Sequence, residues 1–273
     1  MRRQVARDFV LRSPEKRSRI TASGYTALVR ATRDGRPLAA LLLDLDDTIL
    51  DDAAGADEAW ALAADGLVAR QPGLVQAEVV VELERARSWF WEDPERHRRG
   101  RLDLVAARYE IVGLALERLG RPNAELAKET SQAYTTLRDR NQRFLPGAKE
   151  AVECLRGLVP AMALVTNGAS QPQRAKVERF GLAPHFDHIQ VEGEFGLGKP
   201  DPEVYEHVLA SLGVRAEDCL MVGDNFGADV LGAQAAGIHA VWMNVRGKAK
   251  PPGRASKPHW TVQSLEELIA RLV

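Results

Sequence analysis

Three carboxylates and a threonine close an apolar run near the start of the chain. The run begins at Leu38 and reaches Asp44, and Asp46, Asp47 and Thr48 complete the motif. In an extended segment alternate residues share a face, so Asp44 and Asp46 would point to one site. Two carboxylates held this close repel each other unless a cation neutralises them or one carries a proton. The pattern predicts a site for a hard cation such as Mg²⁺; the alternative is an acidic, solvated turn.

Three later motifs also carry groups that can do chemistry. They are Thr166-Asn167-Gly168, Lys199-Pro200, and Gly223-Asp224 with Asp229 five residues on. Taken singly, each is more typical of a turn or a loop with solvated side chains. Together they would add a hydroxyl, an amide, an amine and two carboxylates to the first motif, provided that the fold brings them to one place.

The elements between these motifs predict such a fold. Strands are expected from Leu38 and at 161–165, 186–191, 220–222, 238–243 and 260–262. Helices are expected up to about 158, at 173–180, after Asp201, at 229–236 and from 264. Alternating strands and helices favour an α/β fold with a doubly wound, Rossmann-like parallel sheet. In such sheets ligands bind at the carboxyl ends of the strands, where Asp44, Thr166 and Asp224 would lie.

The apolar pattern has a helical period in the long segment between the first two strands. Residues 55–142 show no strand-like alternation, and turn residues near 72 and 122 divide them into about four helices. We therefore predict an all-helical cap, 55–142, inserted into an α/β core formed by 38–54 and 143–273.

The N-terminal segment, 1–37, has a different composition. It holds ten Lys or Arg against three acidic residues, and the rest of the chain has a net charge of -8. Little apolar periodicity appears in it, so we expect a poorly ordered basic extension. A polybasic arm for an anionic surface, a transit peptide and a start codon assigned too early are alternatives for its origin, and the last is favoured.

Composition excludes several classes of protein. No apolar run approaches the roughly 20 residues that a membrane span needs. Cys154 and Cys219 are isolated and fit reduced thiols, so we expect a cytoplasmic protein, a monomer or a homodimer. The acidic folded part and the lack of interleaved aromatic and basic residues argue against nucleic acid. His185 and His188 are more typical of loop histidines than of a metal pair.

The four motifs, in this order, resemble the haloacid dehalogenase superfamily in its branch with a helical cap after the first strand. The resemblance covers roughly 38–273. Val165-Thr166-Asn167-Gly168 with Gln173 and Lys176, and 219–224, are most similar to the N-acylneuraminate-9-phosphatases and the pyrimidine 5'-nucleotidases. Ala228 is a departure, because many superfamily members carry Asn there.

The resemblance implies a role for each carboxylate. Asp44 would attack phosphorus to form an aspartyl-phosphate, and Asp46 would protonate the leaving oxygen and then activate water. Mg²⁺ would be held by Asp44, the backbone carbonyl of Asp46, and Asp224. Asp229 would orient Lys199 or a water on the metal.

The remaining motif residues would bind the phosphoryl group. Thr166, Asn167 and Lys199 are the implied phosphate contacts, with Lys199 also neutralising charge on the nucleophile. Thr48 would brace the first loop. Specificity would lie in the cap, where Trp89-Phe90-Trp91 and six arginines between 85 and 101 either meet the substrate or, more typically, form core and solvated surface.

The acid at position 46 selects among the activities of the superfamily. Its dehalogenases need no metal and lack this acid, so Asp46 favours a Mg²⁺-dependent phosphatase for a small phosphate ester such as a sugar phosphate or nucleotide. A phosphomutase would share the motifs and remains an alternative. A non-catalytic binding protein on the same fold is a second alternative, against which the intact motifs speak.

Overall fold

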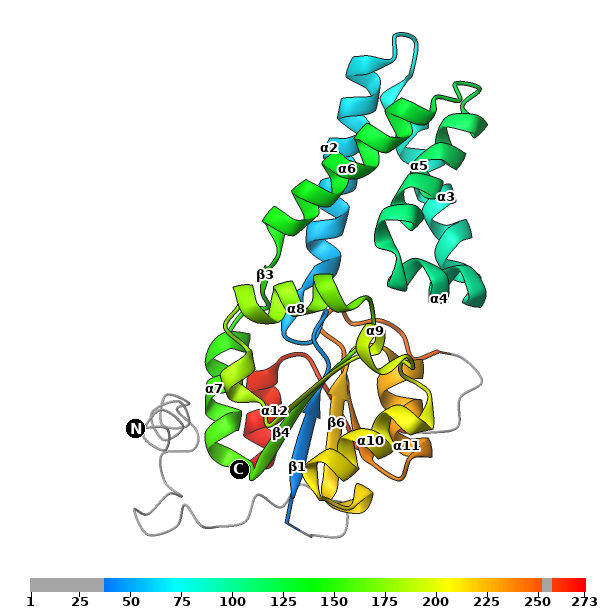
Figure 1. The fold of residues 1–273 in the computed structure, drawn as a ribbon. Coiled ribbons are helices and arrows are strands. Elements are labelled where there is room, and N and C mark those ends of the chain that lie inside the picture. The colour runs from blue at the N-terminus through cyan, green and yellow to red at the C-terminus, as the bar shows by residue number, and fades with distance from the viewer. Residues whose placement is uncertain (1–36, 252–256) are drawn as a thin grey trace. The chain divides into compact units, whose positions relative to one another are not determined.

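A computed structural model describes residues 37–251 and 257–273 and divides them into two compact units (Figure 1). One unit, the core, contains the described residues up to Leu50 and from Phe144 onward; the other, the cap, runs from Asp51 to Arg143. The predicted basic extension, except for Pro37, and part of the loop at 246–258 lie outside the described residues. None of the helices in the described part is both long and apolar enough to span a membrane.

Six parallel strands form the sheet of the core, as the α/β prediction requires. The strands are β1 (Ala40–Leu43), β4 (Ala161–Thr166), β5 (His188–Val191), β6 (Cys219–Gly223), β7 (His239–Met243) and β8 (Trp260–Val262). Their spatial order is β5-β4-β1-β6-β7-β8. After β1 the chain adds β4 and then β5 on one side of β1, and it then returns to add β6, β7 and β8 on the other side. The carboxyl end of β1 lies at this switch point, where ligands bind in such sheets.

Both faces of the sheet are covered, which makes the fold doubly wound. Leu41 and Leu43 of β1 belong to one buried apolar cluster, and Ala40 and Leu42 belong to another. The first cluster includes residues of α7 (Ala148–Leu158), α8 (Ser170–Arg179) and α12 (Leu265–Leu272). The second includes residues of α10 (Pro202–Leu212), η3 (Phe226–Gly232) and α11 (Ala233–Ala235). Alternate side chains of the central strand thus pack against the helices on opposite faces of the sheet.

Short elements complete the core. They are α9 (Glu192–Phe195) and the 3₁₀ turns η1 (Ala183–His185) and η2 (Ala216–Asp218). The start of α10 follows the sequence closely: Asp201 caps the helix by accepting from the Glu203 amide, and Pro202 is its first residue.

The helix expected at 229–236 differs from its prediction. The segment forms a π-helix, η3, from Phe226, and only 233–235 are α-helical. The earlier start has a local cause, because the Asn225 side chain accepts hydrogen bonds from the amides of Gly227 and Ala228. α8 also begins earlier than expected, at Ser170.

The described residues of the cap, 51–143, form helices joined by short turns, with strand residues only at the two ends. Its helices are α2 (Asp52–Arg70), α3 (Gln76–Glu92), α4 (Pro94–Leu102), α5 (Leu104–Arg118) and α6 (Ala124–Asn141). Helices α2, α3, α5 and α6 share one buried cluster that includes Phe90, Ile111 and the stacked rings of Trp60 and Tyr134, whose centroids lie 3.9 Å apart. The expected number of about four is low because Pro94, after an N-capping Asp93, starts the separate helix α4.

The chain enters and leaves the cap through two very short strands that the sequence pattern did not predict. β2 (Leu50–Asp51) and β3 (Arg143–Phe144) pair in a sheet of their own. Two residues are too few to show the period of a strand, so only the three-dimensional structure reveals this pairing.

Candidate active site

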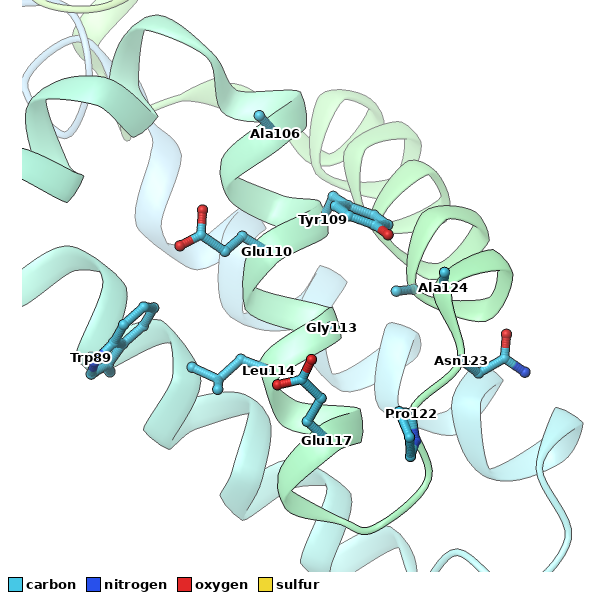
Figure 2. A pocket seen from close by; sticks show the side chains of 11 residues that line it. Trp89, Ala106, Tyr109, Glu110, Gly113, Leu114, Glu117, Pro122, Asn123 and Ala124 are labelled. Atoms are coloured by element: carbon cyan, nitrogen blue, oxygen red, sulfur yellow. The ribbon is translucent and has the colours of Figure 1, made fainter.

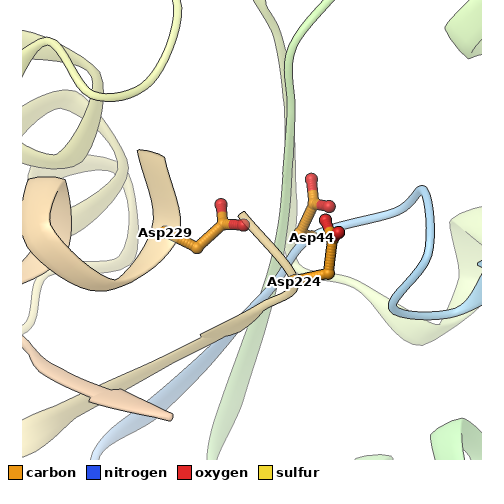
Figure 3. Close-up of side chains that lie close together, drawn as sticks. All are labelled: Asp44, Asp224 and Asp229. Atoms are coloured by element: carbon orange, nitrogen blue, oxygen red, sulfur yellow. The ribbon is translucent and has the colours of Figure 1, made fainter. Parts of the chain in front are cut away.

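Three carboxylates converge at the carboxyl end of β1 and β6. Asp44 follows β1 directly, and its amide donates to the Val222 carbonyl of β6 at 2.9 Å. Asp224 follows β6, and Asp229 lies in η3. One carboxylate oxygen from each residue lies within 4.8 Å of the other two, and the three side chains point toward one another (Figure 3). The order of the strands therefore unites residues that are far apart in the sequence.

Gly223 makes room for this cluster. A Cβ atom at this position would lie 2.2 Å from Cγ of Asp229, so no other residue fits without moving the carboxylate. Asp229 is further fixed by the Asn225 amide, which donates to its Oδ2 at 2.9 Å. The glycine of the Gly223-Asp224 motif thus acts through close approach to a side chain and not through a special backbone conformation.

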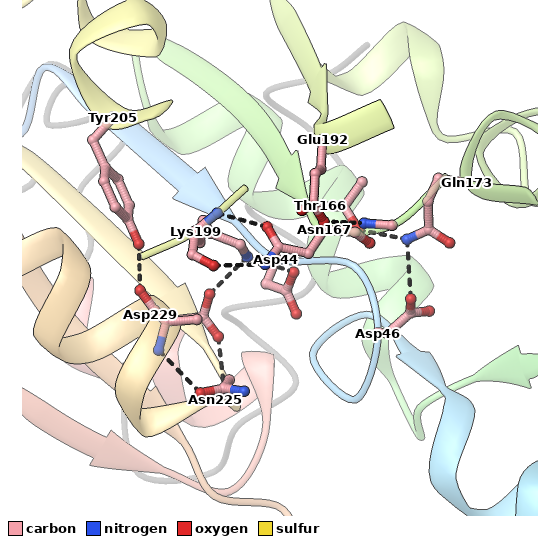
Figure 4. Close-up of polar contacts among 12 residues, drawn as sticks. Asp44, Asp46, Thr166, Asn167, Gln173, Glu192, Lys199, Tyr205, Asn225 and Asp229 are labelled. Carbon is pink, nitrogen blue, oxygen red and sulfur yellow. Dashed lines mark hydrogen bonds and ion pairs between the residues drawn. The ribbon is translucent and has the colours of Figure 1, made fainter. Parts of the chain in front are cut away.

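Lys199 is the cation of the cluster. Its Nζ donates to Asp44 Oδ1 at 2.7 Å and to Asp229 Oδ1 at 2.6 Å, and its side chain is only 2% exposed (Figure 4). Burial by itself lowers the pKa of Lys199, but Asp229 and Asp44 outweigh burial and raise this pKa above its usual range. The amine is therefore a permanent positive charge beside Asp44.

The carboxylates that face Lys199 are short of positive charge. Burial raises the pKa of Asp44 well above its usual range, and Asp229 and Asp224 raise it further against the opposing effect of Lys199. Burial, with Asp229 and Asp47, likewise raises the pKa of Asp224 to about 6. Three carboxylates and the buried ammonium leave two negative charges, which a divalent cation would balance. Lys248, with its Nζ 3.4 Å from Asp224 Oδ2, is exposed, so solvent screens its contribution. An all-oxygen donor set suits a hard ion such as Mg²⁺.

Asn167 holds the backbone of Lys199. Its Nδ2 donates to the Lys199 carbonyl at 2.7 Å, and its Oδ1 accepts from the Lys199 amide at 2.8 Å. The loop after β4 is fixed in turn by buried Glu192, whose Oε2 accepts from the Gly168 amide at 2.9 Å. Sequence reasoning gave Asn167 a phosphate contact and gave Glu192 no role; the phosphate contact stays a prediction. No local signal marks Glu192, because its partner, the Gly168 amide, lies in the loop after the neighbouring strand β4.

Asp46 points to different partners from Asp44. Beyond Asp44 the chain turns: the Ile49 amide donates to the Leu45 carbonyl at 2.9 Å, and Asp47 has a φ of 53°. The argument from an extended segment therefore does not hold past Asp44. Thr48 is buried, and its Oγ1 has no hydrogen-bond partner among the described residues.

The partners of Asp46 are two side chains of α8. Lys176 Nζ donates to both Asp46 oxygens, at 2.7 and 2.8 Å. Gln173 Nε2 donates to Asp46 Oδ2 at 3.0 Å and also to Oγ1 of Thr166, so one amide links the two predicted site residues (Figure 4). Sequence comparison singled out Gln173 and Lys176 without a role. Their spacing of three residues, which places them on one helix face, was the available signal.

The cap contains a groove of its own, with a volume of about 640 Å³, along α5 (Figure 2). Trp89 lines it, whereas Phe90 is fully buried in the cap core. Arg96 stacks on Trp89 with its guanidinium carbon 3.9 Å from the ring centroid. Of the three consecutive aromatic residues, Trp89 thus lines the groove, Phe90 has a packing role and Trp91 is half-buried.

Known proteins are similar to this chain in sequence and in fold. A family model described as haloacid dehalogenase-like hydrolase matches residues 38–237. A phosphoserine phosphatase of Thermus thermophilus is 35% identical over 255 residues, covering 84% of this chain and 96% of that protein. An N-acylneuraminate-9-phosphatase of Mus musculus is 36% identical over 154 residues, 56% of this chain and 61% of that protein. The pyrimidine 5'-nucleotidase YjjG of Escherichia coli is 37% identical over 125 residues, 45% and 54% of the two chains.

Solved structures have a similar fold. The HAD-hydrolase YfnB of Bacillus subtilis, bound to magnesium, superimposes with a TM-score of 0.69 at 26% identity, covering 87% of this chain and 99% of that one. The resemblance drawn from the four motifs, including both named branches, is confirmed by these matches. With its six-stranded parallel core and its helical cap, the chain belongs to the haloacid dehalogenase-like hydrolases.

Proposed function

We propose that this protein is a Mg²⁺-dependent phosphomonoester hydrolase for a small metabolite, acting through an aspartyl-phosphate on Asp44. The observation that carries the proposal is the pairing of Asp44 with Lys199 inside a cluster of three carboxylates, next to a loop that supplies a further acid, Asp46. The names of the relatives support phosphate esters as substrates, and the magnesium in YfnB supports the cofactor.

The reaction would have two steps, formation and hydrolysis of the aspartyl-phosphate, and each site residue would act in one or both. An oxygen of Asp44 attacks phosphorus while the bond from phosphorus to the leaving oxygen breaks, and that oxygen takes the proton of Asp46. Asp46 then takes a proton from water as the water oxygen attacks the aspartyl-phosphate, which returns Asp44 and releases phosphate. Lys199 neutralises charge on Asp44 and the transferring group, and Thr166 donates to a phosphoryl oxygen.

Asp44, Asp224 and the Asp46 carbonyl would hold the metal. When bound, Mg²⁺ supplies positive charge for the phosphoryl oxygens. Asp229 keeps Lys199 in place through its hydrogen bond of 2.6 Å. The cap, 55–142, would select the leaving group, because the core residues serve only the phosphoryl group and the metal.

The proposed function is tested by a panel of phosphate esters. Phosphate release from p-nitrophenyl phosphate should require Mg²⁺ and stop on addition of EDTA. A second panel with phosphoserine, pyrimidine nucleotides, N-acylneuraminate 9-phosphate and glyceraldehyde 3-phosphate, chosen from the relatives' names, then ranks the leaving groups by kcat/KM. No turnover of any ester in the presence of Mg²⁺ would contradict the proposal.

Mg²⁺ should stabilise the protein strongly at pH 7.5 and little at pH 5. The raised pKa of Asp224, about 6 in place of 3.8, means that the folded metal-free protein holds this proton more tightly than the unfolded chain. That contribution to stability is full below pH 3.8 and is lost as pH rises through about 6. Mg²⁺ at a hundred times its Kd should then add about 2.7 kcal/mol at pH 7.5, a Tm increase of several degrees.

The matched variant for this measurement is Asp224→Asn. It removes one charge from the cluster, so its metal-free Tm at pH 7.5 should exceed that of the wild type, and Mg²⁺ should no longer raise it. Thermal unfolding at both pH values, with and without Mg²⁺, checks both points. An equal Mg²⁺ effect at pH 5 and 7.5, or one that survives in Asp224→Asn, would contradict the assignment of the metal to this cluster.

A further inference from the structure

We infer that Lys176 and Gln173 are positioning residues for the leaving-group step: together they hold the Asp46 carboxyl and the Thr166 hydroxyl in fixed orientations. The inference rests on the proposed function, in which Asp46 is the proton donor. All four residues belong to the core, and α8, which carries the pair, begins four residues after β4 ends at Thr166.

Burial shows that the pair is not an ordinary surface ion pair. The Lys176 side chain is 6% exposed and Asp46 is 28% exposed, with two contacts shorter than 3 Å between them. An exposed pair such as Arg174 of the same helix with Glu194 of α9 contributes little, because water screens it. A buried ammonium, in contrast, needs its partner, so it holds that partner in one place.

Gln173 extends this restraint to the phosphate loop. Its side-chain amide has two N–H donors, and it uses them on Asp46 Oδ2 and Thr166 Oγ1. Because Oγ1 of Thr166 accepts from Gln173, the hydroxyl proton of Thr166 points away from Gln173. Its partner in this structure is the Asn167 carbonyl, at a long 3.4 Å, which a phosphoryl oxygen would replace. Gln173 itself is 3% exposed, so water does not compete for these bonds.

This arrangement has a kinetic consequence that depends on the leaving group. An alkoxide leaves only with a proton, whereas nitrophenolate is a stable anion and leaves without one. Losing the restraint on Asp46 should therefore slow the transfer of an alkyl phosphate much more than that of an aryl phosphate. The constant kcat/KM isolates this effect, because it reports the steps up to release of the first product.

The test measures kcat/KM of the full-length protein with p-nitrophenyl phosphate and with an alkyl phosphate, phosphoserine or glycerol 3-phosphate, whichever the wild type turns over faster. Lys176→Met should lose about a hundredfold on the alkyl ester and less than about tenfold on the aryl ester. Lys176→Arg, which keeps a cation, should recover much of the alkyl rate. Gln173→Leu should raise KM for both esters through Thr166 and, beyond that shared loss, should lose more kcat/KM on the alkyl ester than on the aryl ester.

Arg174→Met is the matched control, because it removes a cation from the same helix without touching Asp46. It should keep both rates near those of the wild type. If Lys176→Met fails to fold, Lys176→Gln provides the same ratio of rates. Equal losses on both esters, or no loss on the alkyl ester, would overturn the inference while the wild type still hydrolyses phosphate esters. Absence of turnover in the wild type would instead overturn the proposed function.

Discussion

Asp44→Asn is expected to abolish phosphate release, lowering kcat by about 10⁴-fold or more. The amide cannot form the aspartyl-phosphate, and it also weakens the metal site. Folding should survive, because Asn keeps the size of Asp and removes a carboxylate whose pKa burial and two neighbouring carboxylates already raise. Phosphate release and thermal unfolding of the same preparation separate the two effects. A variant that retains a tenth of the wild-type rate would contradict Asp44 as the nucleophile.

Asp47→Asn is the control for this substitution. It makes the same chemical change three residues away, at a φ of 53°, which Asn adopts readily, and the proposed mechanism gives Asp47 no step. Its rate should stay within about tenfold of the wild type. Acid quenching during turnover gives a second measurement: the wild type should show a phosphoenzyme that hydroxylamine cleaves, as expected of an acyl phosphate, and Asp44→Asn should show none.

The position of the site was predictable because it depends on strand ends. Asp44, Thr166 and Asp224 each follow an apolar segment, and parallel strands bring such ends to one edge whatever their order. The order itself, with β1 between β4 and β6, is set by packing across the whole sheet and had no sequence signal beyond the family resemblance.

Direct partners of the side chains were much less predictable. The resemblance implied a phosphate contact for Asn167, and in the structure both polar atoms of its side chain bind the backbone of Lys199. The two residues are 32 positions apart, and the chain between them runs through a neighbouring strand. The same holds for Asp46 and Lys176, which are 130 residues apart. Such pairs follow from tertiary structure, whereas periodicity reports only which face a residue occupies.

Local chemistry accounts for the places where predicted elements shifted. η3 starts three residues before Asp229 because the Asn225 side chain caps its first turn, and Asp93 with Pro94 divides the cap into one helix more than expected. In both cases the sequence contains the capping residue, but the helix boundaries were predicted from the apolar period over a longer segment. Caps therefore deserve more weight than periodicity in placing the boundaries of this fold.

Lys199 balances the charge of two buried carboxylates inside the core. Lys199→Met leaves the carboxylates of Asp44 and Asp229 buried without their shared cation, since Asp229 is 1% exposed and Asp44 10% exposed. Breaking a buried pair by removing one partner typically costs about 3–5 kcal/mol. The free energy of unfolding in urea at pH 7.5, without metal, should fall by about this amount. Turnover should fall by about 10³-fold, because the charge beside the nucleophile is lost.

The double variant Lys199→Met, Asp229→Asn separates stability from catalysis. Removing one unpaired carboxylate should restore much of the lost free energy of unfolding, whereas turnover should stay low because the ammonium is still absent. Lowering the pH to 5 should also reduce the deficit of the single variant, because the remaining carboxylates can then take up protons. If the single variant were as stable as the wild type at pH 7.5, Lys199 would not be compensating these carboxylates. If the double variant regained turnover together with stability, Lys199 would serve only to hold the fold.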